Sequence, residues 1–521
     1  MFAIRRVHDF RWYLWGPVLL VALGVLAPLS YLVLRAFQGD ASELADLVFR
    51  TRNLRLLGNT LGLAVGVLFF TSAIAFPLAW LATRTDIKGR SIVTLIGVLP
   101  LAVPSYVMAY ALMASTGPSG LVSGLQLPRP SGYFGAWLAL GLYTFPYLFL
   151  NLRAALLGLD PSLEDAARSL GYSNAEVARR VVLPQLRPAF LAGGLLIVLH
   201  VLGDFGVVSL MRFETFSYAI YLQYAAAFDR VYAAWLALML LSLTGTILLL
   251  EMRLLRGRRY ECTGSGSTGN TRMNSLGHWS APAYGFVALV GMAGVLMPVS
   301  TVLYWLGRGA EHARWSDLLN ALLDSCSAAL PAAVLAAILA LPVAYLSVRK
   351  PSKPSRIAER IAFLGYATPP LAFALALIFF TLRSAPFLYQ SLGLLITAYA
   401  LHFLAEAIGP IRSALYLAPA RIQEAARNLG RSPLRAFFEG TFPLLRSGLS
   451  ASMAFVFLSA LKELPITFLL SPLGFRSLAM GVWGAAGESL FSVAAPYSLV
   501  LMVTSCAIVW LLLRETSRVK T

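Results

Sequence analysis

The chain carries one polar stretch twice, and this duplication restricts every fold that it could adopt. The matching positions are Asp165, Ala166, Ala167, Gly171 and Pro184 in the first copy, and Glu424, Ala425, Ala426, Gly430 and Pro443 in the second. Each pair is 259 positions apart, and Arg153 and Arg412 keep the same spacing upstream. Matches at one constant offset indicate that a whole structural unit has been duplicated. The two halves of the chain should therefore share one fold.

Each copy is predicted to form a compact helix-turn-helix of about thirty residues. Ser162 is expected to cap a first helix that opens with two acids, Glu164 and Asp165, at the positive end of the helix dipole. Gly171 is expected to end that helix, because glycine enters the left-handed region without a steric penalty. A second helix over residues 174–182 should then end before the proline of the motif.

Long apolar runs indicate that the chain crosses a membrane many times. Of its 521 residues, 58% are hydrophobic and only 13% are charged, which excludes an ordinary soluble protein. Runs long enough to cross a bilayer begin near Trp12, Gly58, Ser91, Gly135, Ala189 and Val231, and again near Ala281, Asn320, Ile361, Phe387, Gly448 and Ala494. We therefore predict an all-α polytopic membrane protein with twelve transmembrane helices in two tandem six-helix repeats.

The basic residues predict the orientation of these helices. The net charge is +18, and about 30 of the 42 Lys and Arg residues fall in loops on one side of the predicted membrane. This bias places both termini and both copies of the polar stretch in the cytoplasm. Because both copies face the same side, the repeats should be related by an axis along the membrane normal. The basic residues do not gather with aromatic residues on a soluble domain, so no nucleic-acid partner is expected.

Paired prolines extend the repeat into the apolar runs. Three pairs share a spacing of 265 positions: Pro77 and Pro342, Arg84 and Arg349, and Pro104 and Pro369. We expect kinks at these prolines, at equivalent depths in the two halves, where neighbouring helices satisfy the freed backbone groups.

The predicted domains are a first membrane domain over residues 1–252, a cytoplasmic linker over residues 253–280 and a second membrane domain over residues 281–521. The linker contains a Gly/Ser-rich run, residues 263–270, which is typical of a flexible connection. This run lacks the Gly-Lys-Ser/Thr ending of a phosphate-binding loop. The two polar stretches extend over residues 158–188 and 417–447.

No motif in the loops indicates catalysis. Cys262, Cys326 and Cys506 form neither a CxxC motif nor a Cys/His cluster, so we expect free thiols and assign no metal site. No nucleotide-binding motif occurs, and no Ser/His/Asp, Cys/His or metalloprotease spacing. The chain is predicted to bind no cofactor of its own.

Charged residues inside the apolar runs are candidates for a route through the membrane, since a charge in lipid is costly and usually faces a cavity or a partner. Asp204 and Glu463 are 259 positions apart, and two carboxylates near the axis between the repeats would suit a hard cation. His200 lies one turn before Asp204, on the same face. The alternative is structural pairing, because Lys462 adjoins Glu463. Arg212 or His200 could likewise neutralise Asp204.

Other charged residues receive structural interpretations. Arg153 and Arg412 lie at cytoplasmic ends of predicted helices, and we interpret them as snorkelling anchors that fix helix depth. His402 and Glu406 lie one turn apart in the tenth predicted helix, where the first half has two tyrosines. We interpret them as packing groups, with a place along the route as the lesser alternative.

The duplicated stretch resembles the EAA loop of binding-protein-dependent ABC importer permeases, in which an acid-Ala-Ala motif is followed by a glycine and then a proline. Asp165 stands where that family has Glu, which keeps the charge and shortens its reach. The two-copy layout, with Lys462-Glu463-Leu464-Pro465 and Pro472-Leu473-Gly474-Phe475, further resembles ferric iron permeases over nearly the whole chain.

The resemblance implies partners and a location. Helices over residues 162–170 and 422–429, with Glu164 among the coupling residues, would insert into clefts on two copies of a cytoplasmic ATPase. A soluble binding protein would deliver ferric iron at the external face. ATP and Mg would be used by the partner ATPase, and the chain would lie among the lipids of the bacterial inner membrane.

Several alternatives stay open. The same architecture could import thiamine, a polyamine or an inorganic anion. The polar stretches could be merely well-capped cytoplasmic loops. A secondary transporter would need no ATPase and would use an ion gradient through the intramembrane carboxylates, although the paired EAA-like loops argue against it.

Overall fold

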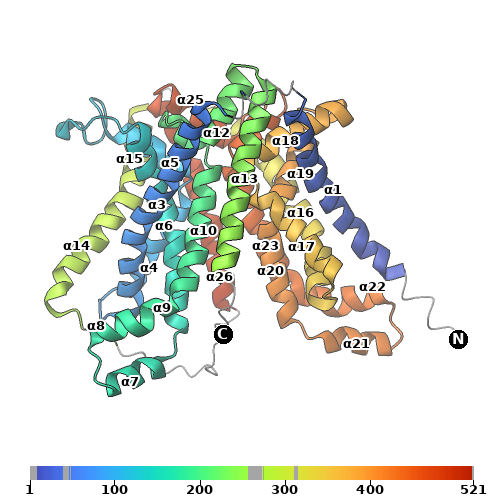
Figure 1. The fold of residues 1–521 in the computed structure, drawn as a ribbon, viewed down its shortest axis with the longest axis horizontal. Coiled ribbons are helices and arrows are strands. Elements are labelled where there is room, and N and C mark those ends of the chain that lie inside the picture. Colours follow the sequence, from blue (N-terminus) through green and yellow to red (C-terminus); the bar gives the residue numbers. More distant parts are fainter. Residues whose placement is uncertain are drawn as a thin grey trace.

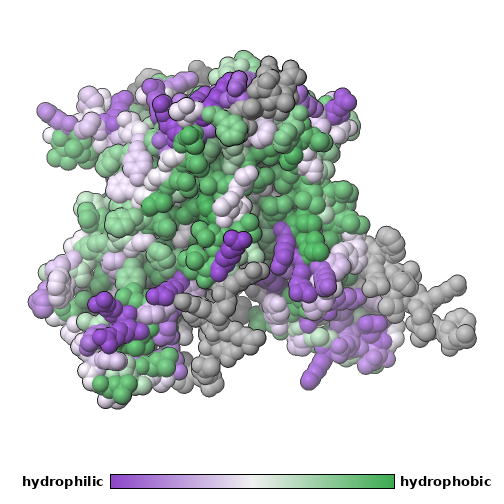
Figure 2. Space-filling view, viewed as in Figure 1, coloured by the Kyte–Doolittle hydropathy of each residue, from purple (hydrophilic) through white to green (hydrophobic). Residues whose placement is uncertain are grey.

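The computed structural model describes residues 9–38, 46, 49–255, 273, 275–309 and 315–518. These residues are largely helical and contain no β-strand. Figure 2 shows apolar side chains in a broad band across the middle of the molecule, with polar side chains gathered above and below it. This distribution suits a bilayer, in which helices satisfy their own backbone groups.

The first half divides into segments before, within and after its polar stretch. Before it come α1 (Asp9–Ala36), α3 (Thr51–Arg84), α4 (Arg90–Val98), η2 (Leu99–Ala102), α5 (Ser105–Ser115), η3 (Ser123–Leu125) and α6 (Gly132–Gly158). The stretch itself forms α7 (Pro161–Ser169), α8 (Asn174–Val177), the π-helix η4 (Ala178–Val182) and α9 (Leu183–Gln185). After it come α10 (Arg187–Gly203), α11 (Gly206–Leu210), α12 (Phe216–Tyr221), the π-helix η5 (Leu222–Ala226) and α13 (Arg230–Leu255).

The second half divides in the same way. Before its polar stretch come η6 (Gly277–Trp279), α14 (Ser280–Gly291), the π-helix η7 (Met292–Leu296), α15 (Met297–Gly309), α16 (Trp315–Arg349), α17 (Lys353–Ala367), α18 (Pro370–Ser384), η9 (Pro386–Leu388), α19 (Leu392–His402) and α20 (Leu404–Leu417). The stretch forms α21 (Ala420–Asn428), α22 (Pro433–Ala436) and the π-helix η10 (Phe437–Thr441). After it come α23 (Phe442–Lys462), α24 (Pro465–Leu470), α25 (Leu478–Gly487) and α26 (Phe491–Arg518).

The described residues contain 8 helices long and apolar enough to cross a membrane, or 12 crossings if each of 4 bent helix pairs forms one span. The sharpest bends are 97° between η2 and α5 and 105° between α17 and α18. Pro104 and Pro369 lie at these bends. Each interrupts its helix, because proline has no N–H to donate and disfavours helix in the residue before it. These two predicted kinks are therefore full breaks. Pro77 and Pro342, in contrast, lie inside continuous helices, α3 and α16.

Each half contributes its first helix to the other half. α1 packs against α16, α17, α18 and α19, so closely that a Cβ added to Gly24 would lie 2.7 Å from Leu401 Cδ1. Conversely, α14 packs on α3 and α4, and the indole Nε1 of Trp305 in α15 donates to the Ala114 carbonyl of α5 at 2.8 Å. Figure 1 shows this exchange, with α1 beside α17 to α19 and α14 beside α3 and α4. The halves are interlocked.

Some predictions fall outside the described residues. Cys262 and linker residues 256–272 are among them. Within the described part, Cys326 and Cys506 are free thiols. The polar stretches both lie within it, and Figure 1 shows them on the same side of the molecule, with α7 to α9 at one end and α21 and α22 at the other. That placement is what parallel repeats require.

Candidate functional site

We call the first polar stretch, residues 158–188, coupling loop 1. Its helix α7 is capped by Asp160, whose Oδ1 accepts a hydrogen bond from the Ser162 backbone N–H at 2.9 Å. The prediction that Ser162 is the cap was wrong, because Pro161 fills a first helical position, where no N–H is needed. The hydrogen bond from Ser162 holds the pKa of the Asp160 carboxyl below its ordinary value. Gly171 follows the helix with φ of +88°.

The second helical segment of coupling loop 1 is longer than predicted. Ser173 and Glu176 form a reciprocal capping box at the start of α8, and the bond from the Ser173 N–H lowers the Glu176 pKa. The chain then widens into the π-helix η4 and continues into α9, whose first turn contains Pro184. Because a first-turn proline costs no intrahelical hydrogen bond, the predicted stop before Pro184 was wrong.

We call the second polar stretch, residues 417–447, coupling loop 2. Its helix α21 follows Pro419, which gives no side-chain cap, and Gly430 follows the helix with φ of +83°. Ser432 caps α22, the π-helix η10 stands at the positions equivalent to η4, and Pro443 lies in the first turn of α23. The two loops therefore share one backbone path, including the π-helical turn.

The acids of the motif have different surroundings. Glu164 is buried, and its carboxylate lies 2.7 Å from an Arg84 guanidinium nitrogen. Asp165 is exposed and pairs with Arg168 at 2.9 Å, while Glu424 is exposed on α21. Of the motif alanines, Ala167 is buried and Ala426 half-buried, whereas Ala166 and Ala425 are exposed. The exposed acids and alanines of both loops are thus available to a partner.

A cavity of about 480 Å³ lies between the two halves, where the helices are broken. Both halves contribute charged or titratable residues to its wall: Asp204, His200, His402, Glu406, Lys462 and Glu463. Among the described residues, no group of three or more His, Cys, Asp or Glu side chains is close enough together to hold a metal ion. The wall can therefore contact a cation without enclosing it in a full ligand set.

Asp204 and Glu463 end their helices instead of lying within them. Asp204 follows α10 and Glu463 follows α23, with nearly equal ψ angles of 129° and 126°. Asp204 accepts hydrogen bonds from the Val207 N–H at 2.8 Å and the Ser105 hydroxyl at 2.7 Å. Glu463 accepts one from the Ile466 N–H at 3.1 Å. Each carboxylate therefore caps the short helix that follows it, α11 or α24.

The ion pairs considered from the sequence do not form. The Lys462 ammonium crosses to the other half and donates to the Leu101 carbonyl at 2.9 Å. His200 Nε2 lies 3.0 Å from the Tyr147 hydroxyl, and Nδ1 lies 2.9 Å from the Leu196 carbonyl. Across the described part of the chain, the two carboxylates have no cationic nitrogen within 4.0 Å. They line the cavity as acids without a charged partner.

Glu406 and His402 belong to the cavity wall, as in the lesser of the two interpretations of these residues from the sequence. Phe403 separates their helices, which are bent by 53°, and the Ser459 hydroxyl donates to Glu406 Oε2 at 2.6 Å. An acid in an apolar run was the signal that singled out Asp204. The same signal is present at Glu406, but the first half has a tyrosine at the equivalent position, so the repeat does not reinforce it.

Arg153 and Arg412 lie near the coupling-loop ends of α6 and α20. Arg412 pairs with Glu359 of α17 at 2.7 Å, so it ties two helices together in addition to any anchoring at the membrane surface. A buried Nε of Arg153 has no hydrogen-bond partner among the described residues. The two arginines are therefore equivalent in sequence position but not in contacts.

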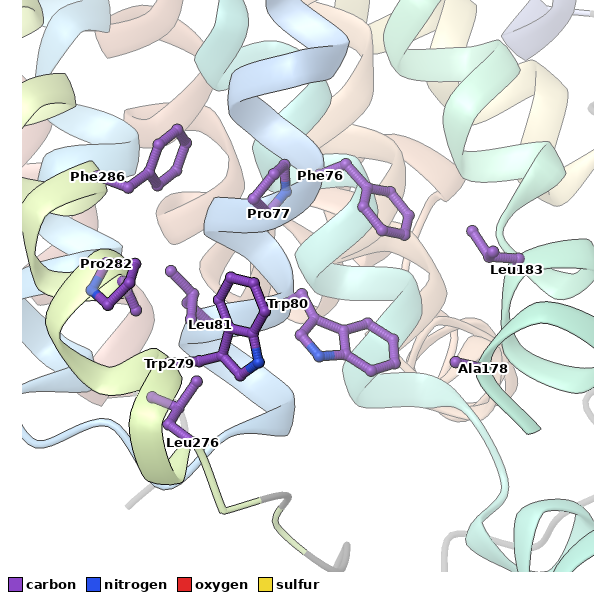
Figure 3. A pocket seen from close by; sticks show the side chains of 11 residues that line it. Phe76, Pro77, Trp80, Leu81, Ala178, Leu183, Leu276, Trp279, Pro282 and Phe286 are labelled. Atoms are coloured by element: carbon purple, nitrogen blue, oxygen red, sulfur yellow. The ribbon is translucent and has the colours of Figure 1, made fainter. Parts of the chain in front are cut away.

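A second cavity is an apolar groove of about 460 Å³ between α3, coupling loop 1 and the start of the second half. Figure 3 shows Phe76 and Trp80 of α3 on one side, Trp279 and Phe286 on the other, and Leu183 of α9 at a third edge. Its lining residues carry no charge. The groove offers nothing to orient an ion, so the central cavity is the candidate route.

Two interlocked six-helix repeats with a shared central cavity and matched loops on one face define a polytopic membrane permease. Residues 75–259 and 329–515 each match the family model described as the binding-protein-dependent transport system inner membrane component. The chain belongs to this family, which comprises permease subunits of ABC transporters.

Known relatives agree with a fused, two-domain permease. The chain is 30% identical to the Fe(3+)-transport system permease protein FbpB 2 of Haemophilus influenzae, over 95% of this chain and 96% of the relative. It is 23% identical to the ferric transport system permease protein FbpB of Actinobacillus pleuropneumoniae, over 87% of this chain and 70% of the relative. The sulfate transport system permease protein CysT of Salmonella typhimurium matches with 28% identity over 39% of this chain and 75% of the relative.

Family membership establishes the general role. The chain is a multi-pass inner-membrane permease component of a family whose members transport with a binding protein and, as ABC transporters, with an ATPase.

Proposed function

We propose that this chain moves ferric iron across the bacterial inner membrane. A soluble binding protein delivers the cargo at the external face, and a separate ATPase uses ATP and Mg on the cytoplasmic side. The observation that supports this cargo most strongly is the 30% identity, over 95% of the chain, to a protein named as a Fe(3+)-transport permease. The relatives named for sulfate transport match only a part of the chain.

The central cavity suits the passage of a hard cation. Asp204, Glu406 and Glu463 place carboxylate oxygens in its wall, and oxygen is the ligand type that hard cations prefer. A transported ion must bind well enough to enter and weakly enough to leave. Three separate carboxylates, without a closed metal site in the described residues, meet both conditions.

The coupling loops are proposed to receive two copies of the ATPase, one on each loop. Helices α7 and α21 would each enter a cleft on one copy, with Asp165 and Glu424 on their exposed faces. Closure of the ATPases on ATP would bring the two loops together and turn the cavity from the cytoplasmic to the external side. In this arrangement both termini lie in the cytoplasm, and lipid surrounds the apolar band of Figure 2.

Reconstitution tests the proposal directly. Proteoliposomes would contain this chain with the candidate ATPase, and the candidate binding protein would be added outside with radioactive ferric iron. We expect iron uptake that needs ATP, the ATPase and the binding protein together. The purified chain alone should neither bind nor hydrolyse ATP. Uptake without ATPase, driven by an ion gradient, would instead identify a secondary transporter.

Oxyanion import is the second candidate, and one observation favours it. Lys462 places an ammonium group in the cavity wall, which would attract an anion. The same proteoliposomes should be tested with molybdate and sulfate. Uptake of either anion in place of iron would reverse the assignment.

A further inference from the structure

A single arginine joins coupling loop 1 to the membrane helices. Arg84 is the last residue of α3, and its side chain is only 3% exposed. One guanidinium nitrogen lies 2.7 Å from Glu164 of α7, and another donates to the Leu156 carbonyl near the end of α6 at 3.0 Å. Arg168 adds a second contact to Glu164 at 3.3 Å. The helix α7 is thus held to α3 by a buried ion pair, and the same arginine is hydrogen-bonded to α6.

The equivalent position in the second half has no ion pair. Arg349 ends α16 and donates to the Leu415 carbonyl at 3.1 Å, as Arg84 does to Leu156. The residue equivalent to Glu164, however, is Gln423, whose side-chain oxygen accepts a hydrogen bond from the Tyr345 hydroxyl at 3.1 Å. Among the described residues, no carboxylate lies within 4.0 Å of Arg349.

The helix α7 is also more buried and better capped than α21. Glu164 and Ala167 of α7 are buried, whereas α21 has no buried residue. Asp160 caps α7 with its side chain, whereas Pro419 gives α21 no side-chain cap. Charge pairing, burial and capping therefore all make the first coupling helix the more firmly held.

The ion pair has a mechanical consequence. A charge buried at this boundary cannot leave its partner without losing most of its stabilisation, because the partner and not water satisfies it. When α7 is pushed, α3 and α6 must therefore move with it. The helix α21 is held instead by hydrogen bonds to neutral acceptors, from Tyr345 to Gln423 and from Arg349 to the Ala418 carbonyl before the helix, so its tilting separates no ion pair.

We propose that Glu164 is a positioning residue that connects coupling loop 1 rigidly to the membrane helices, whereas coupling loop 2 is connected to them more flexibly. This inference rests on the proposed coupling to an ATPase. It means that the two ATPase copies, although identical, act on the permease through unequal connections.

The first test needs no cargo. In the purified wild-type chain, backbone amides of residues 161–169 should exchange hydrogen more slowly than those of residues 420–428. Glu164→Gln should reduce that difference although the Asp160 cap remains, and Gln423→Glu should slow exchange in α21 by placing a carboxylate at the position equivalent to Glu164. Equal exchange of the two helices in the wild type would overturn the proposal, whatever the cargo proves to be.

The second test uses the full complex in proteoliposomes and measures cargo imported per ATP hydrolysed. Glu164→Gln should lower this ratio about fivefold while ATPase association stays within about twofold of wild type. The matched variant Gln423→Ala should lower it less. Equal losses in both variants, or no loss in Glu164→Gln, would overturn the proposal.

A final variant separates an effect on coupling to ATP hydrolysis from an effect on folding. If Glu164→Gln reduces membrane abundance, the double change Arg84→Gln with Glu164→Gln removes both charges and leaves none unpaired. We expect abundance to recover while the ratio of cargo to ATP stays low. Recovery of both would assign the pair a purely structural role.

A wild-type complex that fails to import iron would refute the proposed cargo but would leave the hydrogen-exchange result intact.

Discussion

Ser459 donates a hydrogen bond to Glu406 at 2.6 Å, at the two positions that His200 and Tyr147 occupy in the first half. The same contact thus joins equivalent helices in both halves, but only the second half puts an acid into it. The carboxylate of Glu406 lies in the wall of the cavity. The two walls of the proposed route therefore differ in charge although the contact joins equivalent positions.

We predict that Glu406→Gln lowers ferric uptake about tenfold at nearly normal membrane abundance, because glutamine can still accept from Ser459 but attracts no cation. Tyr147→Phe is the matched control. It loses a neutral hydrogen bond, worth about 0.5–1.5 kcal/mol, and should reduce uptake much less. Uptake assays in proteoliposomes would compare the two variants. An equal loss in both would show that the contact, and not the charge, matters.

Asp204→Asn and Glu463→Gln should each reduce uptake while abundance stays close to wild type. Asn and Gln keep an oxygen that can accept from the Val207 or Ile466 N–H, so the cap of the next helix survives. Asp204→Ala should in addition lose the cap, which costs about 1 kcal/mol. Quantitative immunoblotting of membranes, set beside uptake, separates the two effects. Low abundance of Asp204→Asn itself would indicate a structural role instead.

Replacing Gly171 and Gly430 together with valine should uncouple transport. Both have φ above +80°, and a Cβ at either position would meet no atom within 4 Å, so the cost is backbone strain of about 1–2 kcal/mol each. The protein should still insert, but ATPase association and uptake should fall. Gly245→Val, at an equally open position without a positive φ, serves as control. Wild-type association and uptake in the double variant would refute a role for these turns in coupling.

Lys462→Gln discriminates between the two candidate cargoes. Glutamine keeps a donor for the Leu101 carbonyl, so the contact between the halves is conserved while the positive charge is lost. Iron uptake should stay within about twofold or rise, because a repulsive charge has been removed. A collapse of oxyanion uptake in the same variant would show that Lys462 attracts an anionic cargo.

The sequence predicted the parts of the fold that depend on local chemistry. Apolar runs predicted the crossings, and the spacing of Pro104 and Pro369 predicted matched interruptions. The sequence-based prediction was wrong at helix ends, where neighbouring residues can each cap or interrupt the helix. Asp160 with Pro161 starts α7 two residues earlier than Ser162 would, and Pro184 lies in the first turn of α9 where the sequence predicts a helix end.

The sequence predicts the cavity wall only in part, because only some of its acids are repeated in both halves. Asp204 and Glu463 form a repeated pair, whereas Glu406 has no acidic counterpart in the first half. The ion pair of Glu164 was not predicted either, since Arg84 lies 80 positions away and nothing in their spacing joins them. The exchange of α1 and α14 could not be predicted, because an apolar helix does not specify which apolar neighbour it will meet.

That exchange also affects how the protein is made. The helix α1 is the first described segment to leave the ribosome, and its stripe of Val21, Val25 and Leu32 is almost fully covered in the finished protein. Besides α13 of its own half, its partners lie in the second half and begin at Trp315, so at about 5–20 residues per second the stripe waits roughly 15–60 s in the bilayer for them. A nascent chain that stops after its first half would have α13 to pack on α1 but would lack α16 to α19. Insertion and quality-control factors thus have a time window in which to recognise α1, and joining both halves in one polypeptide ensures that each α1 is followed by its own partner.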